Sequence, residues 1–113
     1  MTETIRDVAQ FKTFINQHPL VVVHVMRDHC SVCHAVLPQV KDLLQETFPQ
    51  VKLAIINQNE VTDIAGELSI FTVPVDLIFM NGKEMHRQGR FIDLQKFERQ
   101  LTPMYEKIYE SSK

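Results

Sequence analysis

Apolar residues recur three or four positions apart in several stretches of this chain and run together without interruption in others. The first spacing lets a helix bury one side, and the second is typical of a strand that is covered on both faces. The spacing predicts helices over residues 5–17, from the cysteine motif at residue 30 to about residue 47, over residues 61–68, and from a cap at Asp93 onward. The apolar runs predict strands over residues 20–26, 51–56 and 73–80.

Proline, glycine and asparagine divide these segments. The pair Asn81-Gly82 follows the third apolar run and predicts a tight hairpin, after which residues 84–88 return as an edge strand. Pro38 lies inside the second helix and is expected to kink it. Pro103 is expected to interrupt the last helix, so that residues 104–113 form a further helical turn or a fraying tail.

The predicted elements alternate in type, in the order helix, strand, helix, strand, helix, strand, strand, helix. Such an order predicts an α/β fold with a central mixed β-sheet flanked by helices. Crossover helices make part of the sheet parallel, and the hairpin adds an antiparallel portion at one side. With 113 residues, of which 44% are hydrophobic, the chain is large enough for one core. We expect residues 1–113 to form a single domain.

Charge and hydropathy exclude several classes of partner. The net charge of -2 leaves no basic face for a phosphate backbone, so we expect no nucleic acid. Residues 1–10 carry Glu3, Arg6 and Asp7 where a signal peptide would need an apolar stretch, and the longest apolar run, residues 20–23, is too short to cross a bilayer. We therefore expect a cytoplasmic protein without membrane contacts. Thiols are kept reduced in that compartment, so a close cysteine pair there is more often catalytic or metal-binding than structural.

The two cysteines of the chain, Cys30 and Cys33, form a Cys-x-x-Cys motif at the start of the second predicted helix, with His29 and His34 directly outside them. This spacing is found in redox pairs, in metal sites and, with the following histidine, in c-type haem attachment. Haem attachment normally needs export, and no signal peptide is predicted. A zinc site needs converging ligands, whereas the two histidines flank a helix start and no second cysteine pair exists. We expect a redox pair without a metal.

Several motifs around these cysteines resemble the thioredoxin family, and the resemblance extends over essentially the whole chain. A strand runs into the cysteine motif, a proline follows the second cysteine, and a Val-Pro pair begins the third strand. The hairpin and the glycine after it match as well. The residues concerned are Cys30, Ser31, Val32, Cys33, Pro38, Val73, Pro74, Phe79, Met80, Asn81, Gly82 and Gly89. The resemblance implies a thioredoxin fold and a thiol-disulfide oxidoreductase.

The resemblance also implies roles for the two thiols, and helix electrostatics gives a physical reason for them. Unpaired N–H groups and the positive end of the helix dipole make a thiol at a helix start more acidic, and the thiolate is the nucleophile. Cys30 occupies that position and is expected to attack substrate disulfides. Cys33 lies one turn further in, close enough to pair with Cys30 and more shielded, so it is expected to resolve the mixed disulfide.

Substrate contacts are implied around the cysteines. In the family, the bond before the proline that begins the third strand is cis, and the preceding residue offers its main chain to a substrate strand. Those positions are Pro74 and Val73 here. On the residues alone, Pro74 would only begin a strand. Further substrate-binding positions that the match implies are His29, Ser31, Val32 and Gly89.

Three positions around the cysteines depart from the family pattern. His29 replaces the usual tryptophan, the dipeptide at 31–32 replaces Gly-Pro, and His34 replaces a lysine. That dipeptide tunes the reduction potential in the family, so a strongly reducing potential cannot be assumed. When protonated, the two histidines would stabilise the Cys30 thiolate together with Arg27, although His34 alone is equally explained as a solvated residue at a helix start.

A further departure lies in the sheet, at His24, where thioredoxins usually carry a buried aspartate that relays protons to the resolving thiol. Asp76 lies in the third strand, two residues after Pro74 and on the same face. The two strands are adjacent in the family's arrangement, so the resemblance allows His24 and Asp76 to pair beneath the cysteines as a proton route to Cys33. Alternatively, His24 bonds to the backbone and Asp76 marks an edge or a bulge.

The function expected from the sequence is that of a cytosolic, bacterial-type protein-disulfide reductase, monomeric and without a cofactor other than its own Cys30–Cys33 disulfide. Its partners would be protein or small-molecule disulfides and an electron donor, either a thioredoxin-reductase-like flavoprotein or a low-molecular-weight thiol. The sequence has no Gly-rich nucleotide-binding loop that could supply the electrons itself. The alternative is a thioredoxin-fold binding or adaptor module whose thiols are non-catalytic or bind metal.

Overall fold

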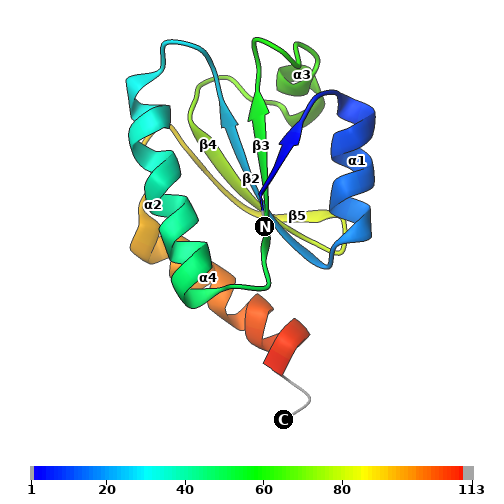
Figure 1. The fold of residues 1–113 in the computed structure, drawn as a ribbon, viewed down its shortest axis with the longest axis vertical. Helices are drawn as coiled ribbons and strands as arrows, with labels where there is room; N and C mark the ends of the chain where they lie inside the picture. The colour runs from blue at the N-terminus through cyan, green and yellow to red at the C-terminus, as the bar shows by residue number, and fades with distance from the viewer. Residues whose placement is uncertain (1, 111–113) are drawn as a thin grey trace.

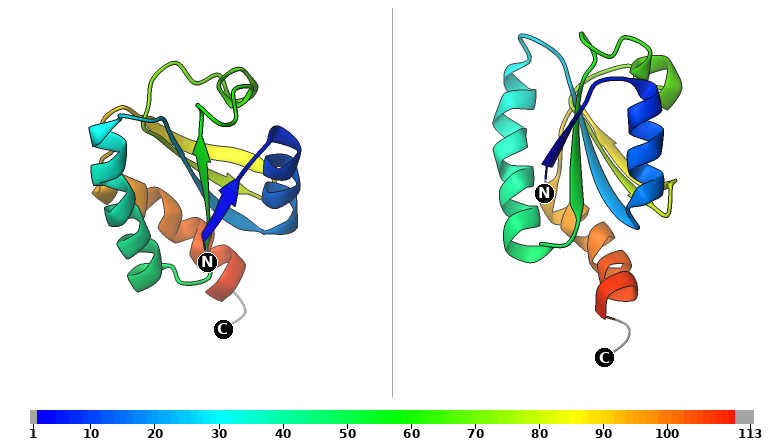
Figure 2. Two further views of the ribbon diagram at one scale, coloured as in Figure 1. Left: turned by 45° about the horizontal axis from the view of Figure 1, so that its top comes forward. Right: turned by 45° about the vertical axis from the view of Figure 1, so that its right-hand side comes forward.

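A five-stranded sheet lies at the centre of the computed structural model, which describes residues 2–110 (Figure 1). The strands are β1 (Thr2–Ile5), β2 (Leu20–Met26), β3 (Lys52–Asn57), β4 (Val75–Met80) and β5 (Lys83–Gly89). The helices are α1 (Val8–Gln17), α2 (Ser31–Thr47), α3 (Ile64–Leu68) and α4 (Leu94–Tyr105), followed by the π-helical turn η1 (Glu106–Glu110). Helices α1 and α3 cover one face of the sheet, and α2 and α4 cover the other (Figure 2).

The sheet is mixed, as predicted, with the strand order β1-β3-β2-β4-β5. Strands β1, β3 and β2 are parallel, whereas β4 is antiparallel to β2, and β5 is antiparallel to β4. The cysteine motif therefore follows the carboxyl end of β2. The start of β4 and the end of β5 lie beside the carboxyl end of β2, because Val75 pairs with both Val25 and Gly89.

Strand β1 corrects the sequence-based prediction, which placed a helix from residue 5 and no strand before it. This strand lies at the edge of the sheet with only β3 beside it, and Ile5 is its one buried residue. A single buried residue leaves no periodic signal in the sequence. The carboxylate of Asp7 then accepts a hydrogen bond from the Gln10 N–H (2.7 Å), so α1 begins only at residue 8.

The prediction that Pro103 interrupts the last helix is also wrong. Helix α4 continues through Pro103 to Tyr105 and passes into η1. A proline removes one intrahelical hydrogen bond, but packing against the core holds the helix together. Tyr105 is buried against Phe48, with ring centroids 5.2 Å apart, and Tyr109 of η1 lies 5.0 Å from Tyr105. Helix α2 likewise continues through Pro38. Of the predicted tail, residues 111–113 lie outside the described residues.

The predicted hairpin at Asn81-Gly82 is confirmed. Both residues have a positive φ, 53° and 81°, as a type I′ turn requires. Strand β5 carries one extra residue, because Ile78 pairs with His86 and Phe79 pairs with Glu84. This bulge was not predicted, since nothing in an exposed edge strand shows which residue lacks a partner.

Residues of β2 point alternately to the two faces of the sheet. Val21 and Val23 pack in the core beneath α1 and α3, whereas Leu20 and Val22 pack in the core beneath α2 and α4. His24 continues the second series and is fully buried. A polar side chain therefore lies within the apolar layer on the α2 side of the sheet.

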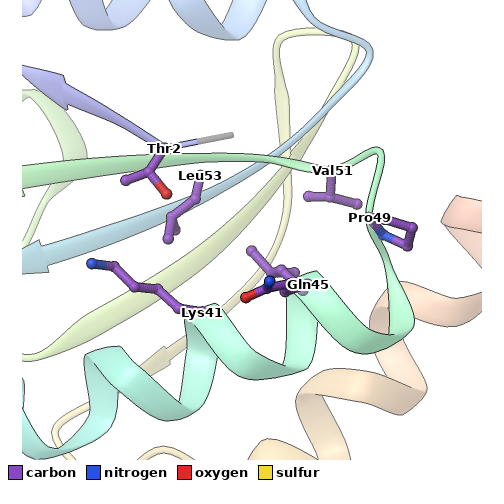
Figure 3. A pocket seen from close by; sticks show the side chains of 7 residues that line it. Thr2, Lys41, Gln45, Pro49, Val51 and Leu53 are labelled. Atoms are coloured by element: carbon purple, nitrogen blue, oxygen red, sulfur yellow. The ribbon is translucent and has the colours of Figure 1, made fainter.

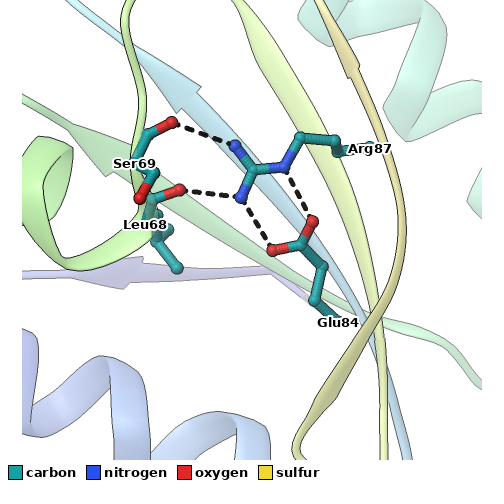
Figure 4. A network of polar contacts seen from close by, with 4 residues as sticks. All are labelled: Leu68, Ser69, Glu84 and Arg87. Atoms are coloured by element: carbon teal, nitrogen blue, oxygen red, sulfur yellow. Dashed lines mark hydrogen bonds and ion pairs between the residues drawn. The ribbon is translucent and has the colours of Figure 1, made fainter.

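Arg87 ties β5 to the end of α3 (Figure 4). Its guanidinium donates to both carboxylate oxygens of Glu84 at 2.7 Å, and also to the carbonyl oxygens of Leu68 (2.7 Å) and Ser69 (3.2 Å). Ser69 has a positive φ of 54° and ends α3. The planar, forked guanidinium satisfies two helix-end carbonyls and one carboxylate at once, which a lysine cannot do.

We expect Arg87→Ala to lower the free energy of unfolding by about 1 to 2 kcal/mol, because it removes charge-assisted hydrogen bonds at a partly exposed site. Glu84→Ala should cost less, since it removes the ion pair and leaves the bonds to the Leu68 and Ser69 carbonyls. Urea denaturation of both variants measures the difference. Equal stability of Arg87→Ala and the wild type would show that the network does not stabilise the fold.

Candidate active site

The cysteine motif forms the turn from β2 into α2. Strand β2 ends at Met26, and His29 has a positive φ of 58° just before the helix begins. Cys30 is the N-cap of α2, with its Sγ accepting a hydrogen bond from the Cys33 N–H (3.2 Å). The first N–H groups of a helix lack intrahelical partners, so an acceptor is favoured at this place, and a thiolate even more than a neutral sulfur.

Cys30 and Cys33 form a disulfide, with their Cα atoms 5.3 Å apart. The two residues differ in accessibility: Cys33 is fully buried, whereas 7% of Cys30 is exposed. Cys30 also lines a surface groove, and Cys33 does not. A substrate in this groove can therefore reach the sulfur of Cys30 first.

Pro74 and Gly89 lie near the motif because of the strand register described above. The Val73–Pro74 peptide bond is cis, and Pro74 is buried. The Pro74 carbonyl accepts a hydrogen bond from the Arg90 N–H (2.6 Å), which joins the segment before β4 to the segment after β5. Within residues 2–110, the main chain of Val73 makes no backbone hydrogen bond.

A groove of about 290 Å³ lies beside Cys30. Three segments line it: residues 27 and 29–32 around the motif, residue 73 before β4, and residues 90–91 after β5. Four of the predicted substrate-binding positions are among them, namely His29, Ser31, Val32 and Val73. Gly89 does not line the groove. The two residues that follow it in the chain do.

Those two residues, Arg90 and Phe91, are the ones that the sequence analysis missed. Phe91 is 77% exposed, and the guanidinium of Arg90 lies 5.4 Å from the centroid of its ring. Arg90 has a positive φ of 67°. Their only sequence signal is the position directly after Gly89. His34, which the sequence analysis considered together with His29, is exposed and does not line the groove.

His24 and Asp76 face each other directly across β2 and β4. The Nδ1 atom of His24 lies 2.7 Å from Oδ1 of Asp76, and both side chains are fully buried. The alternative explanation of Asp76 as an edge or bulge residue is wrong. Strand β4 lies between β2 and β5, and its irregularity falls between Ile78 and Phe79. The structure therefore brings the two polar residues of the buried layer into one hydrogen-bonded pair.

Each member of this pair keeps one buried atom without a hydrogen-bond partner among the described residues. These atoms are His24 Nε2 and Asp76 Oδ2. Gln88 lies opposite Asp76 on β5, but its side chain bonds to His86 Nε2 (3.1 Å) and to the Asp93 N–H (2.6 Å). Buried polar atoms are usually paired, so these two exceptions leave the site with unused hydrogen-bonding capacity.

The environment of the nearby His86 imidazole favours its neutral form. Partial burial, followed by the nearby Lys96 ammonium, lowers the pKa of His86 below its ordinary value of 6.5. An imidazole whose pKa lies below 6.5 is mostly neutral at pH 7.

Among residues 2–110, no group of three or more His, Cys, Asp or Glu side chains is arranged to hold a metal ion. No helix within the same residues is long and apolar enough to cross a bilayer.

A second groove, of about 340 Å³, lies between α2 and the part of the sheet formed by β1 and β3 (Figure 3). Thr2 of β1, Leu53 of β3, and Lys41 and Gln45 of α2 are among its lining residues. Lys41 follows Cys33 by more than two helical turns, which places this groove about 12 Å or more along the helix from the disulfide. It contains no cysteine or histidine and is separate from the redox centre.

Comparison with known proteins agrees with this geometry. The family model described as Thioredoxin matches residues 3–103. Thioredoxin-like protein YdfQ of Bacillus subtilis (strain 168) is 40% identical over 106 residues, which span 94% of this chain and 93% of that protein. Thioredoxin-1 of Saccharomyces cerevisiae is 28% identical over 85 residues, or 75% of this chain and 82% of that one.

Solved structures support the fold. The crystal structure of Malassezia sympodialis thioredoxin superposes with a TM-score of 0.81 at 21% identity, covering 92% of this chain and 93% of that one. The family model extends from β1 into α4, and the Cys-x-x-Cys motif within it stands here as a disulfide at the start of α2. The chain therefore belongs to the thioredoxin family and is a thiol-disulfide oxidoreductase with Cys30 and Cys33 as its redox pair.

Proposed function

We propose that this protein reduces disulfides of other molecules, with Cys30 as the attacking thiol and Cys33 as the resolving thiol. The observation that carries this assignment is their difference in accessibility, since only Cys30 has exposed surface and borders the groove. The Cys33 N–H that donates to Cys30 Sγ would also stabilise a Cys30 thiolate after the disulfide opens.

The proposed cycle consists of two thiol-disulfide exchange steps. The Cys30 thiolate attacks one sulfur of the substrate disulfide and forms a mixed disulfide, and the second substrate sulfur leaves as a thiolate that takes up a proton. Cys33 then loses its proton, attacks Cys30 Sγ and releases the first substrate sulfur as a thiolate. Two electrons pass from the protein to the substrate, and the Cys30–Cys33 disulfide forms.

The main chain of Val73 is proposed to hold an extended substrate segment beside Cys30. Its backbone N–H and C=O make no backbone hydrogen bond to any other residue in the described range, and it lines the groove, so a substrate strand can add to it in the way that a peptide adds to a sheet edge. Pro74 positions Val73 because it is buried and bonded to the segment after β5. Gly89, paired with Val75, contributes by placing that segment rather than by direct contact.

His24 and Asp76 are proposed to take up the proton that Cys33 releases. Cys33 is fully buried in the first turn of α2, and the pair is fully buried on the α2 side of the sheet. A buried thiol has no bulk water to receive its proton, so an internal acceptor speeds its ionisation. The unpaired Nε2 and Oδ2 atoms supply two places where that proton can go.

An external donor must reduce the Cys30–Cys33 disulfide to close the cycle. Membership of the thioredoxin family implies disulfide substrates and such a donor. We propose a thioredoxin-reductase-like flavoprotein or a low-molecular-weight thiol as the donor, the cytosol as the compartment, and a monomer of one domain as the working form. The family match over residues 3–103 supports the single domain.

Alkylation of the reduced protein tests the assignment of the two thiols. At mildly acidic pH, iodoacetamide should modify Cys30 faster than Cys33, because Cys30 is the accessible residue at the helix start. Peptide mapping by mass spectrometry follows each site separately. The same reaction in denaturant is the control, and there the two rates should converge. Faster labelling of Cys33 in the folded protein would reverse the proposed roles.

A further inference from the structure

The groove beside Cys30 has a positively charged rim. Arg27 follows β2 and Arg90 follows β5, and both are exposed residues that line the groove. Neither forms an ion pair with a carboxylate in the described part of the chain. No acidic residue lines the groove. A chain with a net charge of -2 therefore presents two unpaired guanidinium groups next to its attacking sulfur.

The acidic residue next to Arg27 in the sequence, Asp28, is directed away from this rim. Its Oδ1 accepts a hydrogen bond from Asn57 Nδ2 (2.8 Å), and its backbone N–H donates to Asn59 Oδ1 (2.7 Å). Both asparagines belong to the end of β3 and the turn after it. In the sheet, β3 lies on one side of β2, whereas the groove lies toward β4 on the other side, where Val73 lines it. The Asp28 carboxylate therefore does not neutralise the rim.

Apolar surface lies beside these charges. Phe91 is 77% exposed and Val32 is 45% exposed, and both line the groove. The Arg90 guanidinium lies over the Phe91 ring. His29 and Arg90 border the groove with positive φ angles of 58° and 67°. Such angles are uncommon for residues other than glycine and are found preferentially at functional sites.

We infer that the groove accepts an extended segment of a partner protein in which aspartate or glutamate residues lie within two positions of the attacked cysteine, together with an apolar side chain. This inference rests on the proposed role of Cys30 as the attacking thiol. Guanidinium groups bind carboxylates through paired hydrogen bonds, and the two arginines have no such partner among residues 2–110. Phe91 and Val32 provide the contact for the apolar side chain.

The thiol-disulfide exchange steps are the same for every disulfide. The charged rim therefore affects which substrates bind beside Cys30 and not the chemistry itself. Complementary charge raises the rate of encounter and fixes the orientation of the bound segment. An extended segment paired with the Val73 main chain points alternate side chains in the same direction. Carboxylates near the cysteine can then reach the arginines at the groove's border while the substrate disulfide lies at Cys30.

Three matched peptide disulfides test this inference. Each is an internally quenched peptide disulfide of identical length, in which the two residues on each side of the cysteine are all glutamate, all glutamine or all lysine, so that the positions on the same side of the strand as the cysteine are included. The pre-reduced protein is mixed with each peptide, and the rate of cleavage is divided by the rate with dithiothreitol alone, which corrects for the intrinsic reactivity of the peptide. We expect the glutamate peptide to react about tenfold faster than the glutamine peptide at low ionic strength, and the lysine peptide to react slowest. This preference should shrink in about 1 M salt, where the screening length is about 3 Å.

Arginine variants test whether the preference for the glutamate peptide depends on the charged rim of the groove. The double variant Arg27→Gln with Arg90→Gln should lose most of the ratio between the glutamate and glutamine peptides, and each single variant should lose part of it. The ratio cancels any effect of the substitutions on Cys30 itself. Arg99→Gln is the matched control, since it removes the same charge from an exposed position of α4 outside the groove and should leave the ratio unchanged.

Each outcome separates this inference from the proposed function. Equal corrected rates for all three peptides, or an unchanged ratio in the double variant, would overturn the inference while leaving the reductase activity in place. If no peptide were cleaved faster than by dithiothreitol alone, the proposed function itself would be wrong. Oxidised glutathione is included because it carries carboxylates without a longer peptide. Its reduction as fast as that of the glutamate peptide would overturn the assignment to a protein segment.

Discussion

Replacing Cys30 by serine is expected to reduce the rate of disulfide reduction to that of the uncatalysed reaction. Cys30 carries the sulfur that borders the groove, and Cys33 is fully buried and cannot replace it. A serine hydroxyl is not ionised at neutral pH and does not attack a disulfide. Reduction of insulin by dithiothreitol, with and without each protein, measures the effect.

Cys33→Ser is the matched control for this experiment, because both variants lack the internal disulfide and change one sulfur to oxygen. It should still attack the substrate through Cys30 but fail to resolve the product. A covalent adduct with the substrate should therefore accumulate and be visible by mass spectrometry under non-reducing conditions. Turnover by Cys30→Ser equal to that of the wild type would contradict the enzymatic role, and a trapped adduct in Cys30→Ser but not in Cys33→Ser would exchange the two roles.

The second large effect is expected at His24 and Asp76. Replacing either residue by leucine should lower the free energy of unfolding by about 2 to 4 kcal/mol, because the remaining partner is left buried and unpaired. The Nδ1 to Oδ1 hydrogen bond of 2.7 Å between two fully buried side chains is the interaction that is lost. The double replacement His24→Leu with Asp76→Leu should recover much of the stability, since two apolar side chains would then fill the layer beneath α2. Denaturant melts of the reduced proteins give the three values and the coupling energy.

Kinetics separates a chemical role of the pair from a structural one. In stopped-flow experiments with the reduced proteins, the single and double variants should form the mixed disulfide at a rate close to that of the wild type but resolve it more slowly. The double variant is decisive, because it regains stability without regaining a proton acceptor. Normal resolution in the double variant would show that the Cys33 proton leaves by another route.

A second double-mutant cycle, in which no coupling is expected, is the control for the stability measurement. Arg87 pairs with Leu77, a residue of the opposite core layer beneath α1 and α3, so His24→Leu and Arg87→Ala should be additive. If His24→Leu and Asp76→Leu were equally additive, the two side chains would contribute independently, and their contact would have no energetic importance.

The sequence predicted the elements that bury a clear apolar pattern. The run at 20–26 became β2 with the predicted boundaries, and the cysteine motif became the start of α2, which ends at Thr47 as expected. The hairpin at Asn81-Gly82 was predictable because only a few residues tolerate two successive positive φ angles. These signals are local, since each depends on residues that are close together in the chain.

The prediction was less complete where packing outweighs local preference. Strand β1 was missed because it buries one residue, and its existence depends on pairing with β3 about fifty residues later in the chain. Helix α4 passes through Pro103 because Tyr105 packs against Phe48. Neither contact leaves a trace in the neighbouring sequence.

By itself, then, the sequence determined the family resemblance, the redox pair and the presence of two unusual polar residues in buried strands. These features follow from residue type and short-range spacing. Only the tertiary structure decided that His24 and Asp76 lie opposite each other and share a hydrogen bond, because strand register depends on contacts between distant segments. It also decided that Arg27, Arg90 and Phe91 border the same groove as Cys30. The ends of β2 and β5 meet across β4 only when the whole sheet is formed, so the charge of that groove cannot be deduced from any one segment.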